Sequence, residues 1–200
     1  RRRIAAAVAR VADRGRLEIV WRSYELDPAP KEGPAPTPTA AEMMAQWWGG
    51  EAPARIARIR ELGAAEGLEL NMHLSRPVNT FDAHRLCHLA ADRGRAEQML
   101  ERLLRAYHTE GLNVADPRIL ERLGAEAGVD AAEVRALLAG DAYAESVRAD
   151  ERRAAEQGVT AVPSVVIDGR APVPGVQPPA VLQRLLEDAL AESRAVPRHA

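Results

Sequence analysis

The chain has 200 residues and a formal net charge of −2 at pH 7; 46% of its residues are hydrophobic and 28% are charged. A chain of this size and composition buries enough surface to fold around its own core without disulfide or metal support. The near-neutral charge and the lack of any apolar run approaching roughly 18 residues exclude a general attraction to nucleic acid and a membrane-spanning helix, so we expect neither as a partner.

The chain opens with a predicted helix over residues 1–14, because Ile4, Val8 and Val11 share one helical face and Gly15 follows as a stop signal. No capping residue precedes this helix, and three arginines occupy the end where the helix dipole disfavours positive charge. We therefore expect its first turn to lie upstream of the chain.

Residues 17–26 alternate between apolar and polar side chains and are rich in β-forming residues, which predicts a strand. Residues 27–38 hold five prolines and are predicted to form an extended linker without helix or ladder strand.

Residues 39–157 are predicted to be helical almost throughout. Thr39 and Glu42 form a capping-box pattern at the first of these helices. We expect its large apolar residues to form the core of this region, the alternative being an apolar lid that receives substrate: Met43, Met44, Trp47 and Trp48. Six more helices follow. The first stops near Gly63 or Gly67, the second starts at Asn79 or Thr80 and stops at Gly94, and the third stops at Gly111. The fourth starts at Asp116–Pro117 and stops at Gly128, the fifth starts at Asp130, and the sixth runs from about 142 to 157.

The pattern then changes to a β-branched run over 159–167 that holds Pro163. Asp168-Gly169 is a hairpin turn signal, and 173–176 would be the return strand. Pro178 or Pro179 opens a last helix through Leu190, and 193–200 are expected to be a loose tail. This order is the topology of a thioredoxin-like α/β fold with its first strand missing and a helical domain inserted. The predicted parts are 1–38, 39–157 and 158–192.

Pro163 is the residue most indicative of function. A proline at the front edge of a strand removes a ladder donor and can lock a cis peptide bond. A cis Val162–Pro163 bond would turn the backbone of Val162 outward, where an extended peptide or glutathione could pair with it. The plainer interpretation is that Pro163 only starts a strand, but the flanking residues 158–160 and 167–169 favour the functional one.

Residues 158–169 resemble the cis-proline loop and following hairpin of the DsbA family. Residues 20–28 resemble the second strand of its cytosolic FrnE-like branch, and 79–86 resemble that branch's insertion-domain helix. The resemblance extends over about residues 1 to 190. It implies a cytoplasmic thiol–disulfide oxidoreductase that acts on peptide or small-thiol disulfides and needs no metal or organic cofactor. The substrate-binding residues that it implies are Ala161, Val162, Pro163, Asn79, Thr80 and His84.

In that family the first strand leads into a Cys-x-x-Cys pair at the start of the first helix, where the pKa of the attacking thiol is lowered. The corresponding region would lie before Arg1. We therefore expect the chain to be a fragment, inactive as written, and the native protein to carry about 15 to 25 more N-terminal residues. Without that strand, two apolar strands would keep unpaired inner edges.

Two other functions remain open. Glutathione-dependent isomerases of the 2-hydroxychromene-2-carboxylate type and kappa-type glutathione transferases resemble this topology, and they commonly carry Ser in place of the first Cys. If Arg1 lies near the native start, the chain would instead be a peptide-binding protein without catalysis.

The only cysteine, Cys87, excludes an internal disulfide and fits a reducing compartment. It lies among apolar helix positions, where a free cysteine is commonly a small buried hydrophobe. His84 and His88 share a helix face, but no third ligand with clear spacing accompanies them, so we expect no metal site.

Overall fold

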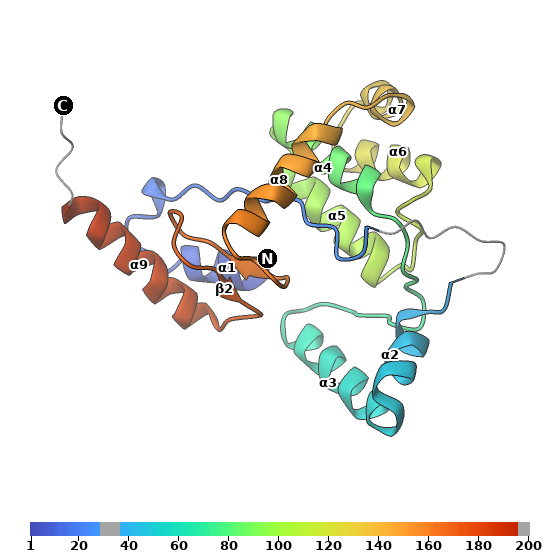
Figure 1. The fold of residues 1–200 in the computed structure, drawn as a ribbon, viewed down its shortest axis with the longest axis horizontal. Helices are drawn as coiled ribbons and strands as arrows, with labels where there is room; N and C mark the ends of the chain where they lie inside the picture. The colour runs from blue at the N-terminus through green and yellow to red at the C-terminus, as the bar shows by residue number, and fades with distance from the viewer. Residues whose placement is uncertain (29–36, 196–200) are drawn as a thin grey trace. The chain divides into compact units, whose positions relative to one another are not determined.

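The computed structural model describes residues 1–28 and 37–195, and it divides the chain into two compact units (Figure 1). The first unit comprises residues 1–24 and 150–200, and the second comprises 25–149. The domain boundaries predicted from the sequence, after residues 38 and 157, stay a prediction, and most of the proline-rich linker lies outside the described residues.

The second unit is helical, as the sequence predicts. Its helices are α2 (Ala40–Trp48), a short 3₁₀ turn η2 (Gly49–Glu51), α3 (Ala52–Ala65), α4 (Phe81–Asp92), α5 (Ala96–His108), α6 (Pro117–Glu126), α7 (Ala131–Ala139) and the start of α8 (Ala144–Glu156), which ends in the first unit. Helices α4 to α7 pack on one another around a single apolar core. The largest fully buried side chains of this core are Leu86, Met99, Leu120, Leu123 and Val134.

Local end signals set the bounds of these helices. The Thr39 hydroxyl accepts from the Glu42 backbone N–H at 3.2 Å while the Glu42 carboxylate accepts from the Thr39 N–H at 2.6 Å, which confirms the capping box. Asp116 and Asp130 cap α6 and α7 through the backbone N–H groups of the first turns. At Gly111 the backbone φ is +66°, a conformation that strains any residue with a Cβ.

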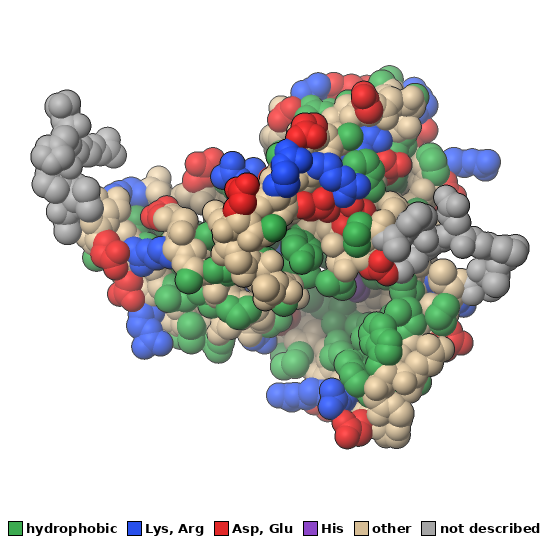
Figure 2. All heavy atoms as spheres, in the orientation of Figure 1, with side chains coloured by type: hydrophobic (Ala, Val, Ile, Leu, Met, Phe, Trp, Pro, Cys, Tyr) green, Lys and Arg blue, Asp and Glu red, His purple; other side chains and the backbone are tan. Residues whose placement is uncertain are grey.

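The helical hairpin α2–α3 contradicts the expected core of the helical region. Trp47 is 65% exposed, and Met43, Met44 and Trp48 are only half-buried. The apolar face of α2 lies outside the α4–α7 bundle, and Figure 2 shows apolar side chains gathered on the surface of this hairpin. The Arg55 guanidinium lies 4.9 Å from the ring centroid of Trp48 and covers part of it.

In the first unit, α1 (Arg2–Val8) packs against α9 (Pro179–Ala195) (Figure 1). The buried apolar residues of this unit come from these two helices and the turn after α1: Ala7, Val11, Leu182 and Ala189. Helix α1 is shorter than the predicted 1–14, because the chain turns after Val8 and forms a 3₁₀ turn, η1 (Arg14–Arg16). Residues 193–195, predicted as tail, belong to α9.

The predicted strand over 17–26 is wrong for this structure. These residues form no helix, but no other described residue pairs with them as a ladder. Alternation identifies residues suited to a pleated backbone, whereas a strand also needs a partner. Ile19 and Val20 are consequently 43% and 52% exposed.

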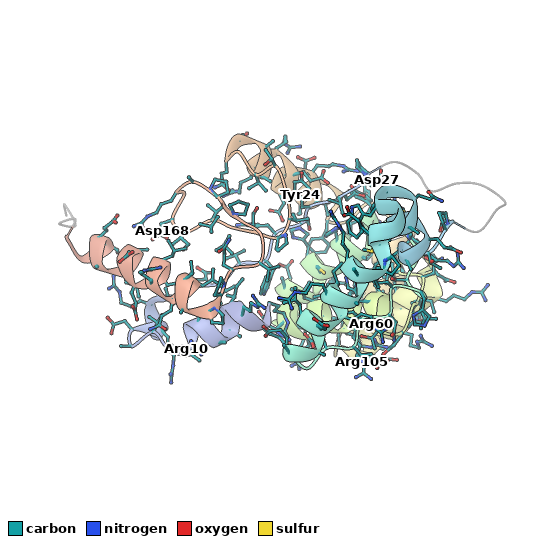
Figure 3. All side chains as sticks on the ribbon, turned by 90° about the horizontal axis from the view of Figure 1, so that it is seen from below. Arg10, Tyr24, Asp27, Arg60, Arg105 and Asp168 are labelled. Atoms are coloured by element: carbon teal, nitrogen blue, oxygen red, sulfur yellow. The ribbon has the colours of Figure 1, made fainter. Side chains whose placement is uncertain are left out.

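The sheet among the described residues is a two-stranded antiparallel hairpin, β1 (Ser164–Val165) and β2 (Val173–Pro174). It is shorter than the predicted strands over 159–167 and 173–176. The turn prediction is confirmed, since Asp168 and Gly169 both have positive φ, at 48° and 72°. Figure 3 labels Asp168 in this loop. No helix among the described residues has the length and apolarity to cross a lipid bilayer.

Candidate functional site

The loop that leads into β1 holds the first three residues implicated by the sequence. Ala161, Val162 and Pro163 are all exposed, and Val162 retains 43% of its accessible surface. The Val162–Pro163 peptide bond is cis. Pro163 directly precedes Ser164, the first residue of β1, so the loop lies at the front edge of the hairpin.

The hydrogen bonds of this loop leave the backbone groups of one residue available for pairing. The Pro163 carbonyl accepts from the Gly175 N–H at 2.7 Å, and the Ala161 carbonyl accepts from the Ser164 hydroxyl at 2.5 Å. The backbone N–H and C=O of Val162 make no hydrogen bond to another of the described residues. Val162 therefore presents an exposed donor and acceptor with which an extended chain can pair.

A buried carboxylate holds the extended segment of the first unit. The Asp150 side chain is 4% exposed and accepts from the Ser23 backbone N–H at 2.9 Å and from Arg22 Nη1 at 3.1 Å. The segment is therefore attached to α8 although no strand flanks it. Sequence analysis missed this contact because the partners are 127 and 128 residues apart.

Asn79, Thr80 and His84 lie together at the first turn of α4, in the second unit, and all three are half-buried. The Asn79 Oδ1 accepts from the Phe81 N–H at 2.9 Å, and the His84 N–H donates to the Thr80 carbonyl at 3.0 Å. The structure brings these three residues together, and it brings 161–163 together in the other unit. That both groups contact one substrate stays a prediction.

Arg85 of the same helix is only 4% exposed. Its Nη2 donates to the Leu137 and Gly140 carbonyls at 2.5 and 2.6 Å, and its Nε donates to the Ala142 carbonyl at 2.8 Å. These bonds serve carbonyls at the last turn of α7 and in the loop directly after it, where regular helical pairing ends. Arg85 therefore joins α4 to α7 and the loop that follows it.

Arg148 of α8 contacts the same first turn of α4 from outside. Its guanidinium carbon lies 4.4 Å from the ring centroid of Phe81, and its Nη1 donates to Glu25 Oε2 at 2.6 Å. The Glu25 side chain is only 1% exposed. The sequence carries no local signal for this contact, since Glu25 and Arg148 are 123 residues apart.

Cys87 is half-buried and packs against the α4–α7 core, as expected. Burial raises the pKa of its thiol to about 12, so the reactive thiolate is scarce at neutral pH. Across the described residues, no three side chains of the metal-ligating types gather in one place. That the activity needs no metal or organic cofactor stays a prediction.

Comparisons with known proteins identify a family and proteins of similar fold. A family model described as "DSBA-like thioredoxin domain" matches residues 1–187. The crystal structure of a Streptomyces coelicolor protein named a "probable DsbA oxidoreductase" superposes with a TM-score of 0.87 at 38% identity, over 96% of this chain and 83% of that one.

Two more distant proteins are similar. An uncharacterized Bacillus subtilis (strain 168) protein, YwbO, is 26% identical over 174 residues, which is 86% of this chain and 82% of its own length. A Nitrosomonas europaea structure named a "putative protein disulfide isomerase" has a TM-score of 0.56 at 19% identity, over 72% of this chain and 76% of that one. The last likeness concerns the fold alone.

Proposed function

The chain belongs to the DSBA-like thioredoxin domain family, and on this premise we propose that it serves thiol–disulfide exchange on peptide or small-thiol disulfides. The observation that carries the proposal is the open backbone edge of Val162 beside Pro163. An extended substrate segment that pairs with this edge is held as an added strand, so that its disulfide is presented to a nearby thiolate.

The exchange itself needs two cysteines. A thiolate attacks one sulfur of the substrate disulfide, which forms a mixed disulfide and releases the other substrate sulfur as a thiolate. A second protein thiol then attacks the mixed disulfide, which leaves the protein oxidised and the substrate reduced; the reverse sequence oxidises the substrate.

Cys87 is unsuited to the first step, because burial raises the pKa of its thiol to about 12. We therefore place the catalytic pair N-terminal to α1, at the helix end where a thiol's pKa is lowered. The finer assignment is the cytoplasmic FrnE-like branch, which rests on the resemblance of 20–28 and 79–86 and on the single cysteine of the chain.

Reading the genomic DNA upstream of the Arg1 codon and expressing the whole gene product tests the proposal. We expect a Cys-x-x-Cys pair and reduction of insulin by the reduced protein. Replacing the first upstream cysteine by Ser should abolish this activity, whereas Cys87→Ala, the matched control, should retain it. A protein with reduced upstream cysteines that reduces neither insulin nor a small disulfide dye would refute the proposal.

One alternative has an observation in its favour. The described chain offers an open edge at Val162 and a thiol of high pKa, which together allow peptide binding without exchange. Titration calorimetry with oxidised and reduced forms of one cysteine-containing peptide separates the two functions. Equal heats with both forms and no change in thiol content would favour binding alone. A serine at the first upstream position would instead favour the glutathione-dependent enzymes.

A further inference from the structure

The first turn of α4 is held by contacts from outside the helix. Its N-cap residue, Thr80, makes no side-chain capping hydrogen bond, and the Asn79 amide oxygen accepts only the Phe81 N–H. A helix start usually gains a capping bond from its N-cap side chain. Side chains that pack against Phe81 therefore add to what holds this turn in place.

Arg148 is the residue that packs there. Its guanidinium stacks on the Phe81 ring at 4.4 Å, within the range of a cation–π contact. The stacked orientation depends on Glu25, whose buried carboxylate accepts the Arg148 Nη1 proton. A lysine at this position would keep the charge beside Glu25 but lose the flat surface that covers the ring.

Arg85 contacts the same turn differently. Its Nη1 donates to Asp82 at 2.8 Å, but its other bonds join α4 to α7 and the loop that follows, so its replacement would disturb the bundle. The Arg148 side chain is 43% exposed, and its contacts include Glu25 and Phe81. Of the two arginines, Arg148 is the one whose shape can be changed with little effect on the helical core.

We propose that Arg148 is a positioning residue for the substrate surface formed by Asn79, Thr80 and His84. Through Phe81 it holds the first turn of α4 in the arrangement that receives a polypeptide substrate, and Glu25 holds Arg148 in turn. This inference rests on the proposed function and on the prediction from the sequence that these three residues contact the substrate.

The test uses the whole gene product with its cysteine pair and two substrates, insulin and the small disulfide hydroxyethyl disulfide. The variants are Arg148→Lys, which retains a charge for Glu25, and Phe81→Leu, which leaves the Arg148–Glu25 pair in place. Each should raise KM for insulin about two- to fivefold, the size of one cation–π contact, with kcat unchanged. Turnover of the small disulfide, which has no polypeptide segment to bind a protein surface, should stay at the wild-type value.

The matched control is Arg93→Lys, which alters the exposed Arg93–Glu133 ion pair in the same unit and should change neither constant. Hydrogen exchange of the His84 amide, bonded to the Thr80 carbonyl, should accelerate in Arg148→Lys and not in the control.

An unchanged KM for insulin in both variants, or an equal loss of kcat on both substrates, would overturn the positioning role while leaving the proposed function intact. A wild-type protein that turns over neither substrate would remove the proposed function itself, and this inference with it. The two failures are therefore distinguishable.

Discussion

Gly124 of α6 packs so closely against Val134 of α7 that a Cβ added to Gly124 would lie 2.7 Å from Val134 Cγ2. Both residues are buried, and Leu86 of α4 lies 3.6 Å from the same point. Three helices of the bundle therefore meet at a position where only a hydrogen fits.

Gly124→Ala should consequently destabilise the protein, although alanine is the better helix former. Overpacking of a buried position costs about 1–3 kcal/mol, which exceeds the gain in helix propensity. Urea denaturation followed by circular dichroism measures the loss. Gly50→Ala is the control, since a Cβ there meets nothing within 4 Å, and it should stay within about 0.5 kcal/mol of wild type. A Gly124→Ala protein of undiminished stability would contradict the tight α6–α7 contact.

Arg85→Lys should lower the stability of the protein markedly, although lysine retains the positive charge. Lysine cannot supply the forked donors that serve the Leu137, Gly140 and Ala142 carbonyls together, so these carbonyls lose charged hydrogen bonds from a buried side chain. We expect a loss of about 3 kcal/mol, from one or two charged hydrogen bonds. The same change at exposed Arg93 should cost under about 1 kcal/mol. Equal midpoints in a urea titration of the two variants would show that Arg85 has no special role.

Cys87 should resist alkylation in the native protein. The pKa of its thiol is raised by burial to about 12, so the thiolate fraction at pH 8 is roughly 10⁻⁴. Iodoacetamide should modify Cys87 slowly in buffer and rapidly in concentrated urea, as mass spectrometry would record. The neutral thiol favours the folded state, so this contribution is full below the unfolded-state pKa and is lost as pH rises toward 12. Rapid labelling of the folded protein at pH 8 would mean that the thiol is accessible.

His108 should make the protein less stable in mild acid. Burial lowers the pKa of its imidazole in the folded state, so the unfolded state binds the proton more readily. This contribution is present above the unfolded-state pKa near 6.5 and is lost as pH falls through the lower folded-state pKa. In the His108→Gln variant, the free energy of unfolding should decrease less between pH 7 and pH 5 than it does in the wild type. His73→Gln, at an exposed histidine, is the control, and an equal effect of both changes would dismiss His108 as the cause.

The sequence was sufficient wherever a few neighbouring residues decide the structure. Thr39 with Glu42, Asp116 and Asp130 start helices at the predicted positions, because capping depends on side chains two or three residues from the groups they satisfy. The turn at Asp168-Gly169 is local in the same sense. The position of Pro163 before a strand was likewise visible from its flanking residues.

The sequence was insufficient where a distant partner decides the outcome. The alternation of 17–26 is real, but no described residue pairs with it, and periodicity does not say which strand is next to it. The apolar face of α2 predicted burial, yet amphipathicity cannot specify what covers a helix, and Trp47 is exposed. The buried carboxylates Glu25 and Asp150 were missed because their partners come from the other end of the chain.

The exposed position of α2 decides what an optical measurement on this protein reports. Two of its three tryptophans, Trp47 and Trp48, belong to that helix, and Trp21 lies in the extended segment of the other unit. None of these indole rings is in the α4–α7 core. The emission spectrum therefore reports on the surroundings of the α2–α3 hairpin and of Trp21, and not directly on the unfolding of the helical bundle. Intrinsic fluorescence and far-ultraviolet dichroism should therefore give denaturation curves that do not coincide, and a quencher such as acrylamide should reach much of the emission in the native protein.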